Sequence, residues 1–306
     1  YTLLTLGWSD GFSFVPVDFA VLSSAKNTNR LVENPEHLDK RTCGYRRRKE
    51  AVQRKPQVAS QLLDHVLAAD ITADYVLMDT WFTNEPMIAC IVEKGLHAIG
   101  MVKELKQRYC LAGASYSLSQ LRSRFVAKNG SEIIGSICVQ TKQGIPVKLV
   151  FIRNRNNPRE WLALLSTDTT LEASEIVRIY GMRWSIEVFF KSTKSLLKLG
   201  SEFQGQCFDM RISHTTLVFT RYILLEWERR HQEDERTLGG LFSLLSEEVW
   251  DLDLKTALRT LMHFFLELKA QVSSEKATDI LRQLMQWIAS QPKYIRDLLA
   301  DLRCEV

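Results

Sequence analysis

Residues Tyr75-Val76-Leu77-Met78-Asp79 form a short apolar run that ends on an acid. A continuous run of this kind is typical of a β-strand that is buried on both faces. A helical pattern at 85–94 and a second apolar run at 97–102 follow it. Because strands that alternate with helices are typical of layered folds, this order predicts an α/β fold with a parallel portion. Asp79 would then lie at a strand end, where open α/β sheets bind their ligands.

The segments before this run predict a β-hairpin and a pair of helices. Residues 2–8 and 12–23 are rich in strand-forming side chains, and Asp10-Gly11 lies between them as a frequent hairpin turn. From 46 to 69 the apolar residues recur at helical spacing. Pro56 interrupts this pattern, so we expect the helix to divide near it.

The rest of the chain divides into a β-rich stretch and a series of helices. Residues 131–139, 146–153 and 161–167 predict three antiparallel strands, which we interpret as an insertion. A single long helix is expected from 174 to about 199, closed by Gly200. Four further segments show helical apolar spacing: 210–230, 238–247, 252–269 and 278–289.

Composition excludes several classes of protein. The chain has 306 residues, of which 45% are hydrophobic and 25% charged, as in ordinary globular proteins of one or two domains. No apolar run approaches the roughly 20 residues of a membrane span. The cysteines form no CxxC pair and no zinc spacing with histidine, so they indicate thiols of a reducing cytoplasm: Cys43, Cys90, Cys110, Cys138, Cys207 and Cys304.

Positive charge is concentrated in two places, although the net charge is only +4. One cluster extends from Arg178 to Lys198. The other, called here the basic block, consists of Lys40, Arg41, Arg46, Arg47, Arg48, Lys49, Arg54 and Lys55. Such clusters attract phosphate. The alternative for the basic block is the solvated start of a helix.

Four side chains recur along the predicted helix at offsets of 3, 4 and 7: Tyr180, Arg183, Glu187 and Lys194. At about 100° per residue they fall within an arc of about 60°, with Lys191 and Lys198 beside them. A salt-bridge ladder is one interpretation, because Arg183 and Lys191 lie four residues on either side of Glu187. Apolar neighbours such as Trp184 and Val188 leave this stripe narrow. A narrow ionic stripe on a buried helix costs desolvation, which favours a binding site.

Together the two acids, Asp79 and Glu187, suit a divalent cation, because Mg²⁺ and Mn²⁺ prefer carboxylate oxygens. Two such ions about 4 Å apart activate the attacking oxygen and stabilise the leaving oxygen in phosphoryl transfer. Arg183 and Lys194 would bind flanking phosphates, and Tyr180 would orient one of them. A structural alternative remains open for Asp79, which then caps the next helix or pairs with a basic side chain.

The spacing Tyr180-x2-Arg183-x3-Glu187-x6-Lys194 resembles the Y-R-E-K signature of IS4-type insertion-sequence transposases. Residues 7–11, 16–19, 74–82 and 165–168 resemble the same family, so the resemblance covers nearly the whole chain. It implies an RNase H-like core of the DDE class, a mixed sheet flanked by helices, with a β-rich insertion and a helical C-terminal region. It also implies that Asp79 and Glu187 are the second and third catalytic acids and metal ligands, and that four residues bind DNA: Tyr180, Arg183, Lys191 and Lys194.

The resemblance also implies boundaries and a missing part. The first part of the core would span 1–103, the insertion 104–172, the helix with the glutamate 173–202, and the helical region 203–306. The family's first aspartate lies on a strand before the hairpin. We assign neither Asp10, in a turn, nor Asp18, within a strand, to that role. We therefore expect a chain that is truncated at its N-terminus and inactive by itself.

For the intact protein, the resemblance implies metal-dependent hydrolysis at transposon ends, followed by strand transfer into target DNA. The partners would be double-stranded DNA and a second copy of the chain, in the cytoplasm and without a membrane. One alternative is an inactive remnant that binds DNA or blocks assembly, and another is an RNase H-like nuclease without transposition. Trp81 and Trp161 either stack on a displaced base or belong to the core.

Overall fold

The computed structural model describes residues 1–104, 107–125, 132–154, 157, 160–202, 205, 207–231, 237–246, 256, 261, 274–291 and 296. The chain forms two compact units, Tyr1–Glu228 and Arg229–Val306. The first unit contains every residue of the predicted site. In the described part of the chain, no helix is long and apolar enough to cross a membrane.

The predicted hairpin is confirmed. Strands β1 (Thr2–Ser9) and β2 (Phe14–Leu22) pair in the antiparallel sense, with an irregularity at Leu6/Gly7. Asp10 fixes the turn, because its Oδ1 accepts hydrogen bonds from the N–H groups of Phe12 and Ser13 at 2.9 and 2.8 Å. These two strands form a sheet of their own.

The second sheet has seven strands in the order β3-β4-β9-β8-β7-β5-β6. Strand β3 (Tyr75–Met78) is parallel to β4 (His97–Val102), whereas the other neighbours are antiparallel. The remaining strands are β5 (Tyr109–Leu111), β6 (Ala114–Tyr116), β7 (Ile133–Thr141), β8 (Pro146–Arg153) and β9 (Trp161–Ser166). The predicted β-rich insertion therefore continues the core sheet, since β9 pairs directly with β4.

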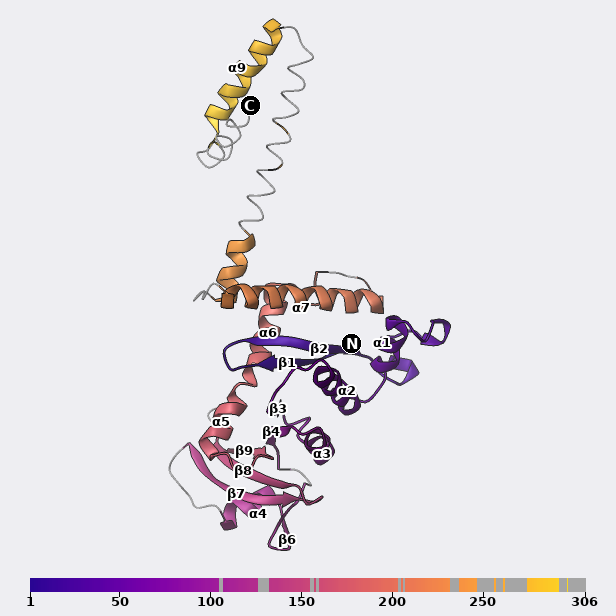
Figure 1. The fold of residues 1–306 in the computed structure, drawn as a ribbon, viewed down its shortest axis with the longest axis vertical. Coiled ribbons are helices and arrows are strands. Elements are labelled where there is room, and N and C mark those ends of the chain that lie inside the picture. The colour runs from indigo at the N-terminus through magenta and orange to yellow at the C-terminus, as the bar shows by residue number, and fades with distance from the viewer. Residues whose placement is uncertain are drawn as a thin grey trace. The chain divides into compact units, whose positions relative to one another are not determined.

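The helices of the first unit surround these strands (Figure 1). They are α1 (Cys43–Ala51), α2 (Lys55–Ala68), α3 (Glu85–Glu93), α4 (Leu118–Phe125), α5 (Ala173–Gly181), α6 (Trp184–Ser195) and α7 (Phe208–His231), which continues three residues past the end of the unit at Glu228. Short 3₁₀ turns occupy Asn27–Asn29 and Pro35–His37. The interruption that Pro56 predicts separates α1 from α2. In the second unit, residues 238–246 are helical and α9 spans Ser274–Ser290, while the helix predicted at 252–269 lies outside the described residues apart from Thr256 and Leu261.

Alternation along the strands gives the second sheet two apolar faces. On β4, Ala98 packs into a cluster with residues of α2, α3 and α4, whereas its neighbour Ile99 packs into the cluster of α5. Val150 and Leu164, from β8 and β9, belong to the α5 face, and both are fully buried. The sheet therefore lies between two layers of helices (Figure 1).

Strand β3 differs from the prediction in one respect. Tyr75, Val76 and Leu77 are only half-buried, and Met78 alone is buried, at 6% exposure. A strand buried on both faces was expected. The reason is that β3 pairs only with β4, and its other edge faces a cavity.

The single helix predicted over 174–199 is wrong, because the structure has two helices. Between them the N–H groups of Met182 and Arg183 bond to carbonyls three residues earlier, as in a 3₁₀ turn. The helices α5 and α6 contact different layers, the larger sheet and the hairpin strand β2 respectively, so the chain must change direction between them. The second helix ends at Ser195 and not at Gly200.

A methyl group at Gly100 is expected to destabilise the protein. A Cβ there would lie 2.2 Å from Thr83 Oγ1, which donates to the Asp79 carbonyl at 2.6 Å. Gly100→Ala should lower the free energy of unfolding by about 1–3 kcal/mol, measured by urea denaturation. Gly181→Ala is the matched control, because nothing lies within 4 Å of its Cβ, and it should raise stability by up to about 1 kcal/mol. Equal effects of the two substitutions would contradict the packing described here.

Candidate active site

Asp79 directly follows β3, and its carboxylate organises the next turn. Oδ1 accepts hydrogen bonds from the N–H groups of Trp81 and Phe82 at 2.9 and 3.1 Å. The interpretation of Asp79 as the cap of the next helix is wrong, because Asn84 caps α3 through the N–H of Met87. Within the described residues no hydrogen bond uses Asp79 Oδ2, and the side chain is exposed. One carboxylate oxygen therefore faces outward from a fixed turn.

The predicted site residues of the 180–194 segment lie on both sides of the turn between α5 and α6. Arg183 Nη2 donates to Glu187 Oε1 at 2.7 Å, and its guanidinium carbon lies 5.6 Å from the centroid of the Tyr180 ring. Glu187, Lys191 and Lys194 line one cavity of about 750 Å³. Carboxylate and ammonium groups therefore share one surface of α6.

The structure brings the two predicted acids to the same region. Asp79 and Arg183 line a common cavity, and Arg183 is bonded to Glu187. Burial raises the pKa of Tyr180. The positive charge of Arg183 lowers this pKa, whereas the negative charges of Asp79 and Glu187 raise it further. Both carboxylates must lie near this phenol to act on it, although they are 108 positions apart (187 − 79) in the sequence. Whether they are metal ligands remains a prediction.

The surroundings of Glu187 differ from the prediction of a narrow stripe. Trp184 and Val188 are 61% and 45% exposed, so the ionic face of α6 is wide and solvated. The desolvation argument for a site is therefore wrong. The Arg183–Glu187 pair expected of a ladder does form, and at such exposure it contributes about 0–1 kcal/mol to stability. The convergence with Asp79 is the stronger reason to place a site here.

Residues 51–208, more than half of the chain, match the family described as Transposase DDE domain. The chain belongs to this family of transposase domains. A search of curated proteins finds no match. The family match contains Asp79 and Glu187. It leaves out the β1–β2 hairpin, all but the last residue of α1, all but the first residue of α7 and the helices that follow, although we expected resemblance over nearly the whole chain. The mixed sheet of this chain, which is flanked by helices, is consistent with the RNase H-like fold of a DDE transposase.

DDE transposases generally use divalent metal ions, and the two acids fit part of such a site. Mg²⁺ is commonly held by one or two carboxylates, with water and substrate phosphate completing its octahedron. Asp79 Oδ2 and the second oxygen of Glu187 suit this role. Among the described residues, no three His, Cys, Asp or Glu side chains gather as metal ligands. Asp18 is engaged elsewhere, since its Oδ2 lies 2.9 Å from His65 Nδ1.

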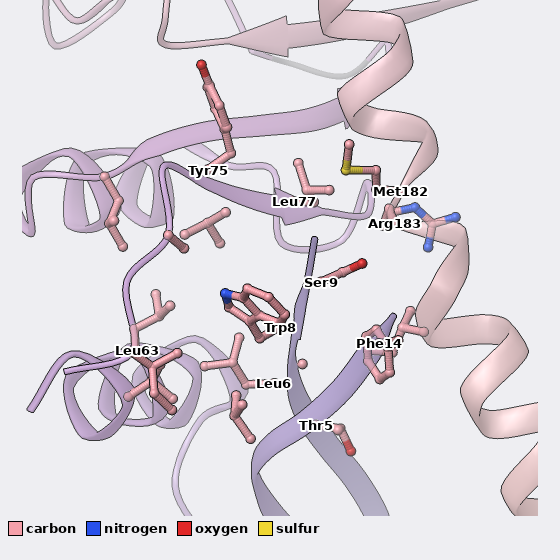
Figure 2. Close-up of a pocket in the computed structure, with 18 of the residues that line it drawn as sticks. Thr5, Leu6, Trp8, Ser9, Phe14, Leu63, Tyr75, Leu77, Met182 and Arg183 are labelled. Carbon is pink, nitrogen blue, oxygen red and sulfur yellow. The ribbon is translucent and has the colours of Figure 1, made fainter. Parts of the chain in front are cut away.

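A cavity of about 180 Å³ lies between the two sheets of the first unit, beside this site (Figure 2). Thr5 and Leu6 of β1 line one side, and Leu77 of β3 lines the other. Each of these strands pairs with a neighbour only on its far edge. Met182 and Arg183 also line it, and Thr5 Oγ1 is buried there without a hydrogen-bond partner. The sequence carried no signal for this cavity, because it depends on which strand edges remain unpaired.

The basic block divides into structural and exposed residues. Arg48 is 5% exposed and forms two hydrogen bonds with Asp209 at 2.7 and 2.8 Å. Arg47 pairs with Glu50 and donates to the carbonyl of Phe19. The prediction that the whole block faces phosphate is therefore wrong for these two arginines. The exposed cations are Lys40, Arg41, Arg46, Lys49 and Arg54, of which Arg41 pairs with Asp39.

The pKa of Tyr180 provides a test of the convergence of the two acids. Asp79→Asn and Glu187→Gln should each lower this pKa, because each removes a negative charge that disfavours the phenolate. The measurement is a ring-carbon NMR titration with labelled tyrosine, with Tyr180→Phe to assign the signal. Glu175→Gln is the control, since Glu175 pairs with Arg178 on the exposed face of α5, and it should leave the titration unchanged. A response to only one of the two acids would mean that they do not converge.

Proposed function

We propose that this protein is a DNA transposase of the IS4 type, which hydrolyses phosphodiesters at transposon ends and transfers the freed strand to target DNA. The observation that supports it is that Asp79 lines a cavity with Arg183, which is hydrogen-bonded to Glu187, in a chain of the DDE family. The substrate is double-stranded DNA. The active assembly is proposed to contain two copies of the chain, so that each transposon end meets one site.

Each residue of the site has a proposed role. Asp79 and Glu187 bind Mg²⁺ or Mn²⁺, which supplies a Lewis acid at the scissile phosphate. Arg183, Lys191 and Lys194 pair with the phosphates on either side, and Tyr180 donates its hydroxyl proton to one of them. Burial lowers the pKa of Arg183, but its hydrogen bond to Glu187 and the nearby negative charges raise it overall, so the guanidinium stays charged.

The reaction proceeds in two displacements on phosphorus. A water oxygen first forms a bond to the phosphorus at the transposon end, and the bond to the 3′ oxygen breaks, so that oxygen leaves as a hydroxyl. That hydroxyl then bonds to a phosphorus of target DNA and displaces the target's own 3′ oxygen. Both steps need a positioned phosphate and stabilised oxygen charge, which the cationic face of α6 is suited to provide.

We further propose that the active form has one more strand, between β1 and β3, which carries a third acid. The cavity between the open edges of β1 and β3 supports this proposal, because an inserted strand would hydrogen-bond to both edges and join the two sheets. Thr5 Oγ1 would gain a partner. Such a strand would end near Asp79 if it ran parallel to β3.

The second candidate function follows from the number of acids. Because the described residues hold no cluster of three potential metal ligands, a chain limited to these 306 residues would bind DNA without cutting it. It would then act as an inactive remnant, or as an inhibitor that occupies transposon ends. A remnant or inhibitor of this kind would still bind DNA, which a protein without any function would not. It would not cleave DNA, which the enzyme would.

Cleavage assays test the site directly. The 306-residue chain should leave DNA uncut in Mg²⁺, whereas a chain extended by an apolar strand ending in aspartate should cut it. In the extended chain, Asp79→Asn and Glu187→Gln should each reduce the rate by at least about 100-fold, because even outer-sphere partners of metal ligands contribute 10–100-fold. Glu175→Gln is the matched control and should cut normally. Strand transfer by the unextended chain would overturn the proposed third acid, and full activity of Glu187→Gln would overturn the site.

The exposed part of the basic block is proposed to contact DNA flanks. Arg46→Glu and Lys49→Glu should weaken binding to duplex DNA and reduce the slope of log K against log salt by about 0.9 for each phosphate that the protein no longer neutralises. The measurement is fluorescence anisotropy over a salt series. Lys142→Glu, in the exposed turn between β7 and β8, makes the same charge change and should leave the slope unaltered. An unchanged slope in Arg46→Glu and Lys49→Glu would exclude this interaction.

A further inference from the structure

Another cavity lies beside the turn that Asp79 organises, on the side of Trp81. It has a volume of about 670 Å³, and its lining includes Gln53, Arg54, Lys55 and Trp81. Neither Asp79 nor any residue of α6 lines it. It is therefore distinct from the candidate metal site, although Trp81, which lines it, follows Asp79 by only two positions in the sequence.

Trp81 presents a large flat surface to this cavity. The side chain is 53% exposed, so much of its apolar area remains in contact with water. Its position is nevertheless fixed. The backbone N–H of Trp81 donates to Asp79 Oδ1, and the indole ring packs edge-on against Phe82 with 4.7 Å between centroids. An exposed ring held in one place is a preformed platform for another planar group.

Positive charge lies next to this platform. Lys55 Nζ lies over the Trp81 ring, 5.3 Å from its centroid, and Arg54, the residue before it, is exposed. Trp161 makes a contrast, because its ring packs on Phe151 within the core. A base that stacks on Trp81 would therefore take the place of the Lys55 ammonium over the ring, and it would leave both cations close to its attached phosphate.

One polar group in the lining also lacks a partner. Gln53 Oε1 is buried without a hydrogen bond, and Gln53 is one of the residues that line the cavity. A buried acceptor left unsatisfied costs about 1–3 kcal/mol, so a donor from a ligand would remove that cost. The N–H groups on the edge of a nucleobase are donors of this kind.

We propose that this cavity binds one unpaired nucleotide of the DNA, with its base stacked on Trp81 and its phosphate paired with Arg54 and Lys55. The inference rests on the proposed function, since it adds a subsite for the DNA strand that passes Asp79. Stacking is tolerant of sequence, because every base has a flat face, and the cations contact only the backbone. Gln53 accepts a hydrogen bond from the base edge.

Binding of single-stranded oligonucleotides to the full chain tests the proposal without catalysis. The probe is a labelled single strand of mixed sequence, followed by anisotropy. Trp81→Ala should weaken its binding by roughly 5- to 150-fold, whereas Trp81→Phe should keep most of the affinity. Trp227→Ala is the matched control, because that indole on α7 is 57% exposed and does not line the cavity, and it should bind as the unaltered protein does.

Two further measurements identify the base and the phosphate. In a set of probes that each lack one base, the probe without the stacked base should bind Trp81→Ala and the unaltered protein with equal affinity. Lys55→Ala should reduce the salt slope by about 0.7, the value for one phosphate of a single strand. Unchanged single-strand affinity in Trp81→Ala would overturn the proposal, as would an equal loss on blunt duplex. Neither result would affect the proposed function, which the cleavage assays test separately.

Discussion

Ile176 and Ile179 hold α5 against the larger sheet, and the arrangement of the site depends on this contact. Both are buried against Ile99, Val150 and Leu164, which come from three different strands. Burying an isoleucine contributes about 1.5–3 kcal/mol, so this small cluster is enough to fix the helix on the sheet. The turn after α5 then brings Arg183 and Glu187 toward the end of β3. Without this packing, Asp79 and Glu187 would have no reason to approach one another.

The charges of the site gather at low cost because they lie near water. Glu187 and Lys194 are exposed, and Arg183 is partly covered by its contact with Tyr180. A fully buried cluster of this kind would carry a large desolvation penalty before any substrate arrived. In a transposase, which must exchange water for phosphate oxygens, a solvated cationic face leaves the incoming DNA backbone to complete the neutralisation. The exposed indole of Trp81 lies in the same turn as Asp79. It is likewise solvated, and a base of the incoming DNA would cover it.

The two open sheet edges are the least usual feature of the fold. Unpaired strand edges are normally covered or blunted, because they attract other strands. Here β1 and β3 leave their edges toward a common cavity, and residues of β2, α2 and α6 are among those that form its other walls. The half-exposed residues of β3 and the unpartnered hydroxyl of Thr5 have the same origin. A strand that filled this space would change the burial of all of them together.

Much of the fold could be predicted from local patterns, because their hydrogen bonds connect residues that are close in the sequence. The Asp10-Gly11 turn, the interruption before Pro56 and the four-residue step from Arg183 to Glu187 are of this kind. The exposure of Trp184, the division of α5 from α6 and the open edge of β3 could not be predicted. Each depends on which distant segments pack together. Arg48 illustrates the reason, since its partner Asp209 lies 161 residues away, and periodicity along a chain contains no information about contacts at that separation.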